Sequence, residues 1–238
     1  MKDQYVGDIS DYFKYAFLRR AQNAGAKLVI SWMLTAPDGK SDGAKRDYLS
    51  NPEKFRPVDP EAFDALTAIE SAGHHSIAAV EASGILRGVP CQNDIFPDDN
   101  EDRAQLMWRL EESTLSFQQA TVFFDPDNGL EISSKKPGRK DSSKFLFVNE
   151  FAQMARAGRS VIVYQHLGQR HMPRSEFLTS QLDRLAAIRG AYEHFALVSP
   201  LAAALCAEPL DGARPLRDAA EDLVAAWPDK KTQILSRV

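Results

Sequence analysis

The sequence has few cysteines and no long apolar run, and both absences exclude classes of protein. Cys91 and Cys206 are the two cysteines in 238 residues, and they lie far apart without a CxxC pair. Neither a disulfide framework nor a cysteine zinc site is expected, and both thiols are predicted to be buried. No stretch approaches the roughly 18 apolar residues of a membrane span, and the N-terminus has no apolar core of signal-peptide length. We therefore expect a cytoplasmic protein without a membrane partner.

A strong excess of either charge is also missing. The formal net charge of −4 argues against a uniformly basic nucleic-acid binder, although a local basic patch remains compatible with it. Hydrophobic residues make up 44% and charged residues 26% of the chain, as in ordinary globular proteins. The length suits one large α/β domain with a full core and is short for two domains. We expect a single domain over residues 1–238, with a mainly helical insertion at about 46–119.

A buried strand that ends on polar turn residues is the most informative feature. The apolar run Thr121 to Phe124 is followed directly by Asp125-Pro-Asp-Asn-Gly129. Such a run predicts a central strand of a parallel sheet. In an open α/β sheet, ligands bind outside the carboxyl ends of the strands, so Asp125, Asp127 and Asn128 are candidate site residues. A plain strand-to-loop turn is the alternative, because these residue types are common in turns.

The remaining pattern predicts a doubly wound, mostly parallel, Rossmann-like α/β sheet. The further strands are expected at Lys27 to Leu34, Val161 to Tyr164 and Phe195 to Val198, the last forming a hairpin with 202–207. The first expected helix begins at Asp8 or Ser10 and ends near Gly25. Five further helices are expected at 59–73, 100–119, 145–157, 175–189 and 216–227. Residues 76–86 fit either a helix or a strand.

Three further polar features lie near the proposed strand end or in the first helix. Gln165 and His166 end the next strand and should neighbour the Asp125 turn. His166, with His171 close behind, could be a base, a ligand or a substrate contact, or a hydrogen-bonded structural histidine. Residues 133–140, the basic loop, are either a solvated loop or an arm that contacts phosphate. Lys14 stands among aromatic residues of the first helix, where most lysines extend to solvent.

Two short motifs carry a resemblance to a known family. The run Gly7-Asp-Ile-Ser-Asp11-Tyr-Phe-Lys14 and the run Asp125-Pro-Asp-Asn128 resemble motifs of the 23S ribosomal RNA adenine methyltransferases. The lysine matches, whereas the histidine that follows it in the family is Tyr15 here. Asn128 stands where the family has the aromatic residue that stacks on the flipped adenine.

This resemblance implies an S-adenosylmethionine-dependent methyltransferase sheet with a helical insertion after the first strand. It implies methyl transfer to an amino group of a nucleic-acid base, RNA or DNA. Asp125 and Asn128 would be catalytic, and Lys14, Trp32 and Asp127 would bind the cofactor, Lys14 by pairing with its carboxylate. The family's glycine-rich turn after the first strand is represented here only by residues 34–39, which include a proline.

Two other classes of function stay open. Asp125, Asp127 and Glu131 crowd carboxylates just ahead of Lys135 and Lys136, as a magnesium-dependent nuclease would require. However, Glu131 and Lys135 are four residues apart, whereas nuclease strands place Glu and Lys two apart. The third class is a non-catalytic, methyltransferase-like binding protein, which the altered glycine turn favours.

Overall fold

The computed structural model of the protein describes residues 2–36, 45–117, 119–156, 158–168, 172–188, 190–228 and 230–237. His171 and residues 37–39 of the predicted cofactor turn lie outside these ranges. Within them, no helix combines the length and apolar character needed to cross a membrane.

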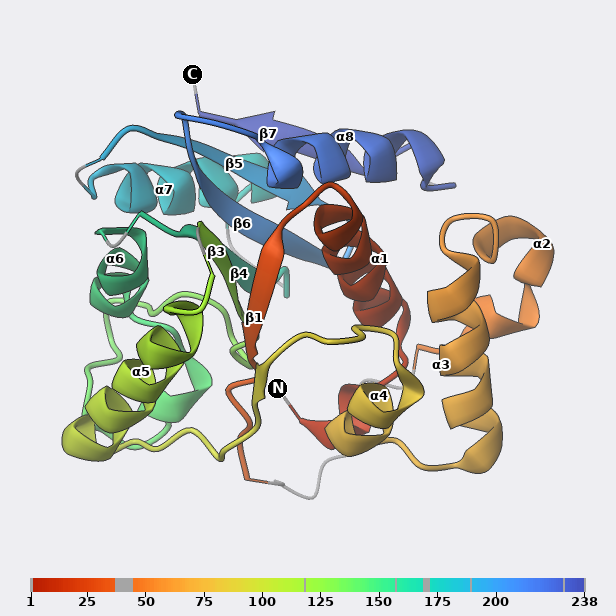
Figure 1. Ribbon diagram of the computed structural model, residues 1–238, viewed down its shortest axis with the longest axis horizontal. Coiled ribbons are helices and arrows are strands. Elements are labelled where there is room, and N and C mark those ends of the chain that lie inside the picture. The colour runs from red at the N-terminus through yellow and green to blue at the C-terminus, as the bar shows by residue number, and fades with distance from the viewer. Residues whose placement is uncertain are drawn as a thin grey trace.

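A seven-stranded mixed sheet forms the centre of the described structure (Figure 1). Its order is β2-β1-β3-β4-β6-β5-β7, in which β2, β1, β3 and β4 are parallel and each later pair is antiparallel. The strands are β1 Lys27–Ser31, β2 Cys91–Gln92, β3 Ala120–Phe124, β4 Ser160–His166, β5 Tyr192–Val198, β6 Ala202–Pro209 and β7 Gln233–Ser236. The α/β architecture with a parallel centre is as expected.

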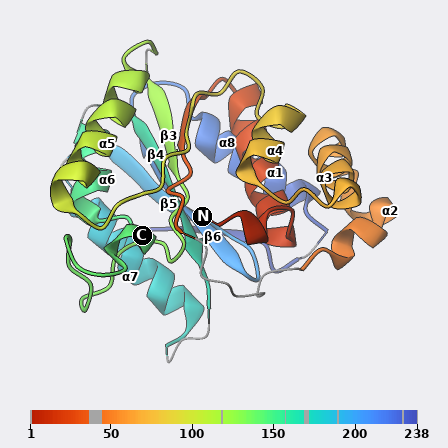
Figure 2. The same cartoon turned by 90° about the horizontal axis from the view of Figure 1, so that it is seen from below.

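Helices cover both faces of this sheet. Figure 2 shows α5, α6 and α7 on one side of the strands and α1, α3, α4 and α8 on the other. The helices are α1 Ile9–Asn23, α2 Pro52–Phe55, α3 Pro60–Ala72, α4 Ile77–Ser83, α5 Asn100–Thr114, α6 Val148–Arg156, α7 Arg174–Ala186 and α8 Pro215–Ala226, with short 3-10 turns η1 Asp3–Tyr5, η2 Asp47–Ser50 and η3 Ser142–Lys144. The result is a three-layer arrangement with an apolar core on each face of the sheet.

The central strands are apolar throughout because both of their faces are buried. Phe123 packs into the core beneath α1, whereas Val122 and Phe124 pack into the core beneath α5 to α7. Successive side chains of a strand point to opposite faces, so a strand covered on both sides needs apolar residues at every position. This explains why the sequence shows continuous apolar runs instead of alternation.

Most predicted elements are confirmed, with some shifts in extent. The strand at 27–34 ends at Ser31, because Met33 has a φ of 45° that lies outside the extended region. Residues 77–83 are helical (α4), which resolves the ambiguous 76–86 segment. The sequence analysis did not identify β2 or β7, two short strands that lie at the edges of the sheet.

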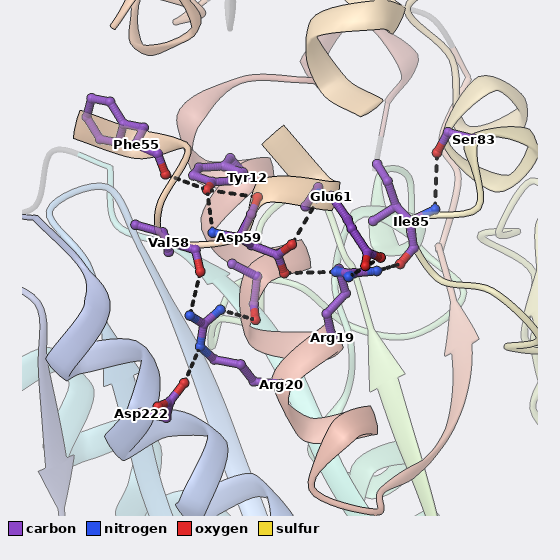
Figure 3. A network of polar contacts seen from close by, with 12 residues as sticks. Tyr12, Arg19, Arg20, Phe55, Val58, Asp59, Glu61, Ser83, Ile85 and Asp222 are labelled. Carbon is purple, nitrogen blue, oxygen red and sulfur yellow. Dashed lines mark hydrogen bonds and ion pairs between the residues drawn. The ribbon is translucent and has the colours of Figure 1, made fainter. Parts of the chain in front are cut away.

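Helix α1 ties the segment 46–119 to the C-terminal helix through a polar network (Figure 3). Arg19 donates to Asp59 at 2.8 Å, and Arg20 donates to Asp222 of α8 at 2.7 Å. The Tyr12 hydroxyl donates to the Phe55 carbonyl at 2.8 Å. Two separate parts of the chain, the segment 55–59 and α8, are thereby fixed around the helix that also carries Lys14.

Candidate functional site

The carboxyl ends of β1 and β3 form a topological switch point. From β1 the chain passes to β2 on one side, then crosses back to β3 on the other side, and both are parallel to β1. In doubly wound sheets the crevice at such a reversal is where ligands bind. Asp125 follows β3 directly, and its backbone N–H donates to the Ser31 carbonyl at 3.1 Å. The predicted position of the Asp125 turn, at the carboxyl edge of the parallel strands, is confirmed.

Strand register brings three side chains to one face at this edge. Ser31 pairs with Phe124, and Phe124 pairs with Val163. The next residue on each strand therefore points to the opposite face, toward α1. These residues are Trp32, Asp125 and Tyr164. Alternation along three strands thus assembles a polar and aromatic site that no local sequence run contains.

Lys14 of α1 enters the centre of this group. Its Nζ donates to Asp11 Oδ1 at 2.6 Å and to Asp125 Oδ2 at 2.7 Å, and the residue is only 2% exposed. The same ammonium lies 5.0 to 5.6 Å from three ring centroids, within cation–π range. The rings belong to Tyr15, Trp32 and Tyr164. We call these six residues the Lys14 cluster. Lys14 does not extend to solvent, which was the alternative for a lysine among aromatic residues.

The electrostatics of the cluster depend on burial and on these pairs. Burial acts to lower the pKa of Lys14, but the carboxylates of Asp11 and Asp125 outweigh it and raise that pKa above the ordinary value. Burial also raises the pKa of Asp11, which Lys14 only partly offsets. Asp8, which caps α1, has its pKa raised to about 7 by burial and then by the nearby Asp11 charge. The lysine therefore stays charged, whereas one neighbouring carboxylic acid titrates near neutral pH.

Asp127 lies at the same switch point and connects β3 to the segment after β1. Its Oδ2 accepts a hydrogen bond from Thr35 Oγ1 at 2.6 Å and lies 3.6 Å from Lys2 Nζ. Burial acts to raise the pKa of Asp127, but the positive charge of the N-terminal amine, hydrogen bonding from Thr35 and the charge of Lys2 together bring that pKa below the ordinary value. Asp127 is thus anionic at neutral pH beside the end of β1.

An open pocket of about 580 Å³ lies next to Asn128, on the face of the sheet covered by α6 and α7. We call it the Asn128 pocket. Phe147 and Phe177 contribute apolar walls, and Lys135, Lys136 and Arg184 contribute cations. Asn128 is exposed, unlike the buried Asp125. The structure therefore separates the two residues predicted to be catalytic: Asp125 lies in the Lys14 cluster and Asn128 lines the pocket.

Gln165 fixes the turn that carries Asn128. Its Oε1 accepts from the Leu130 N–H at 3.0 Å, and its Nε2 donates to the Asn128 carbonyl at 3.0 Å. Gly129, with a φ of 84°, lies directly against this amide, so that an added Cβ would be 2.2 Å from Gln165 Oε1. The expected proximity of Gln165 to the Asp125 turn is confirmed, and Gly129 is required for it.

His166 lies on the other face from Gln165, beside the Lys14 cluster. Its ring centroid is 5.5 Å from that of Tyr164 and 6.2 Å from that of Tyr5. Burial lowers the pKa of His166, although the Asp125 charge acts in the opposite direction. The imidazole is therefore mainly neutral at neutral pH.

The three carboxylates considered for magnesium have separate partners. Glu131 accepts from Arg184 Nη2 at 2.6 Å and from the Val148 N–H at 2.9 Å, away from the Lys14 pair of Asp125. Asp127 bonds to Thr35 as described. Over the described ranges, His, Cys, Asp and Glu side chains do not gather in groups of three that could hold a metal ion. A nuclease site built from these three acids would require all of these contacts to rearrange.

The structure brings some predicted site residues together and gives others different neighbours. Lys14, Trp32 and Asp125 share one cluster, as expected, but Lys14 is held by two carboxylates where a cofactor carboxylate was expected. Trp32 is fully buried, and its indole N–H donates to Glu81 at 2.9 Å. Sequence reasoning considered Asp11 only as a residue of the first motif and Tyr164 only as a candidate ring in place of the family's stacking aromatic residue, and it assigned neither as a partner of Lys14.

Comparison with known proteins finds no protein-family model, no curated protein and no solved structure that matches this chain.

Proposed function

We propose that this protein is an S-adenosylmethionine-dependent methyltransferase that acts on an amino group of a nucleic-acid base. One observation carries the proposal: Asp125, Asp127 and Asn128 follow β3 at the switch point of a mixed sheet whose centre is parallel. Ligands of this architecture bind at that point. The same run is one of the two in which the sequence resembles the 23S ribosomal RNA adenine methyltransferases, and the helices between β1 and β3 are a further likeness.

Asp127 is the acid at the switch point that would face a positively charged cofactor. Asp11 and Asp125 are paired with Lys14, whereas Asp127 lies 3.6 Å from Lys2 Nζ and also experiences the charge of the N-terminal amine. Bound S-adenosylmethionine supplies a methyl group on a sulfonium cation, which a neighbouring carboxylate stabilises. In this proposal Asp127 would hold the cofactor beside the end of β1, and Trp32 and Lys14 would form the buried support beneath it. In this proposal Lys14 would not contact the cofactor itself but would hold Asp125 in place through their ion pair.

The Asn128 pocket would hold the substrate base. The side-chain amide of Asn128 offers both a donor and an acceptor, and its oxygen can accept a hydrogen bond from the substrate amine. An adenine or cytosine amine is barely basic, so holding its lone pair in the right direction matters more than removing a proton. Lys135 and Lys136 of the basic loop line the same pocket and would contact the phosphates. Asp125, held by Lys14, keeps the end of β3 in place between the two ligands.

Transfer of a labelled methyl group from S-adenosylmethionine to RNA and DNA fragments tests the proposal. We expect Asn128→Ala to lower turnover at least about tenfold, because the substrate amine loses an orienting contact. The fold should persist, since the Asn128 backbone N–H keeps its bond to the Lys144 carbonyl. Asn51→Ala is the matched control, because Asn51 is also exposed but lies on the segment before α2. It should transfer methyl groups at the wild-type rate.

Two outcomes would contradict the proposal in different ways. If the wild-type protein binds the cofactor but methylates no RNA or DNA fragment, it is a binding protein with this fold. If it binds magnesium and cleaves the fragments instead, the nuclease is the better account. Equal methylation by wild type and Asn128→Ala would refute the role of Asn128 alone.

A further inference from the structure

A second pocket, of about 280 Å³, lies apart from the Lys14 cluster and the Asn128 pocket. Four segments that are distant in the sequence form it: the first turns of α1, the end of α2, the turn between β5 and β6, and the residues after α8. Its lining residues are Ile9, Ser10, Phe13, Lys54, Phe55, Ser199, Pro200, Leu201, Trp227, Pro228 and Lys230. We call it the Trp227 pocket. Its volume lies just below the range of about 300–1,000 Å³ for drug-sized ligands, so it suits a compact molecule.

Aromatic side chains form one wall of this pocket. The Trp227 ring lies edge-on to Phe13, with centroids 5.0 Å apart, and 6.3 Å from Phe55. Trp227 is 8% exposed and Phe13 only 1%, so these rings are fixed by the surrounding core. A rigid aromatic wall favours a planar ring as ligand, because offset and edge-to-face contacts add to the burial of apolar area.

A hydroxyl that is open to the pocket faces the same space. Ser10 is 6% exposed and lines the pocket, and its side chain makes no hydrogen bond to any residue that the structure describes. The hydroxyl oxygen itself is reached by solvent. A ligand oxygen in the pocket would therefore accept a hydrogen bond from this hydroxyl.

Two lysines are the charged residues among the described ones that line the pocket. Lys54 and Lys230 are exposed at its edge. The Lys54 ammonium lies 5.2 Å from the Phe55 ring centroid, over the aromatic wall. Two ammonium groups beside a hydroxyl that can donate favour an anionic group on the ligand.

We propose that the Trp227 pocket binds a small planar aromatic ligand that carries a single anionic group, a phosphate or a carboxylate. The ring lies against Phe55 and the edge of Trp227, which Phe13 supports from the core, and the anion lies between Ser10 and the two lysines. The proposal does not depend on methyltransferase activity, because no residue of the Lys14 cluster or the Asn128 pocket takes part in it.

Trp227 fluorescence supplies the test, with phenyl phosphate and benzoate as the two anionic probes. We expect at least one of them to change the emission of the full-length protein in a saturable way, and Trp227→Phe to remove that change. The double variant Lys54→Glu with Lys230→Glu should weaken the apparent affinity at least about tenfold, since it places two acids at the anion site. The double variant Lys27→Glu with Arg109→Glu reverses two exposed charges outside both pockets and should leave it unchanged.

Neutral benzyl alcohol and inorganic phosphate complete the design. Each carries half of the recognised chemistry, so each should bind at least about tenfold more weakly than the better anionic probe. The proposal is overturned if no anionic probe changes the emission, if benzyl alcohol binds as tightly, or if the charge reversal at Lys54 and Lys230 has no effect. None of these results bears on methyl transfer.

Discussion

Replacing Lys14 with methionine should destabilise the protein strongly, because Lys14 compensates two buried carboxylates. Its ammonium lies 2.6 Å from Asp11 and 2.7 Å from Asp125, with side-chain exposures of 1 to 4% for all three. Removing one partner of a buried ion pair costs about 3–5 kcal/mol, since the other charge stays buried without compensation. For a chain of this length that corresponds to a fall in Tm of roughly 6–20 °C. Methionine nearly preserves the volume, so packing contributes little to the loss.

Thermal and urea unfolding of four proteins would separate charge from packing. Lys14→Met combined with Asp11→Asn and Asp125→Asn should regain most of the lost stability, because no uncompensated charge remains. Lys54→Met is the control for a surface lysine and should stay within about 0.5 kcal/mol of wild type. A Lys14→Met variant that melts like the wild type, or a triple variant that melts lower than the single one, would refute this account of the cluster.

Three further predictions concern stability. Gly129→Ala should lower the urea midpoint more than Gly158→Ala. Both glycines have a positive φ (84° and 78°), but only at Gly129 does the new Cβ meet Gln165. Overpacking of this kind costs about 1–3 kcal/mol, and equal losses in the two variants would contradict the clash. Arg103→Lys should destabilise the protein by at least about 2 kcal/mol and speed proteolysis of the basic loop. A lysine cannot reproduce the guanidinium hydrogen bonds to the Glu150 carboxylate and to the carbonyls of Ser142 and Phe145. An unchanged rate of cleavage would argue that these bonds do not hold the loop. The Asp8 pKa of about 7 exceeds the ordinary 3.8, so the folded protein gains stability from this group at low pH and loses it as the pH rises through about 7. The free energy of unfolding of Asp8→Asn minus that of wild type should therefore rise between about pH 5 and about pH 8, and a constant difference would refute the assignment.

The fold could be predicted where burial alone determines the pattern. The run 121–124 is apolar at every position because helices cover both faces of β3, and its abrupt end at Asp125 marks the sheet edge. The strands β2 and β7 gave no comparable signal, since β2 has two residues, β7 has four, and none of these side chains is fully buried. Strands at a sheet edge are held by backbone hydrogen bonds to a neighbouring strand. This pairing leaves no apolar pattern in the sequence of the edge strand itself.

The candidate site was predictable only in part, for a related reason. Asp125 and Asn128 were found because they follow a strand, but their separation onto two faces depends on strand alternation and on Gln165. Trp32 was expected near Asp125, and applying the same alternation to β4 could have placed Tyr164 there in advance. The Trp227 pocket carries no sequence signal, because four distant segments form it.

Calorimetry with S-adenosylmethionine and its demethylated product tests the central claim most directly. The account predicts one binding site per chain in the wild-type protein, and an affinity at least about tenfold lower in Asp127→Ala, because Asp127 lies at the switch point beside Thr35. Asp64→Ala, which removes an exposed acid on α3, should bind like the wild type. The absence of any heat at millimolar ligand, or equal affinity in Asp127→Ala and wild type, would contradict the claim that the cofactor binds between β1 and β3.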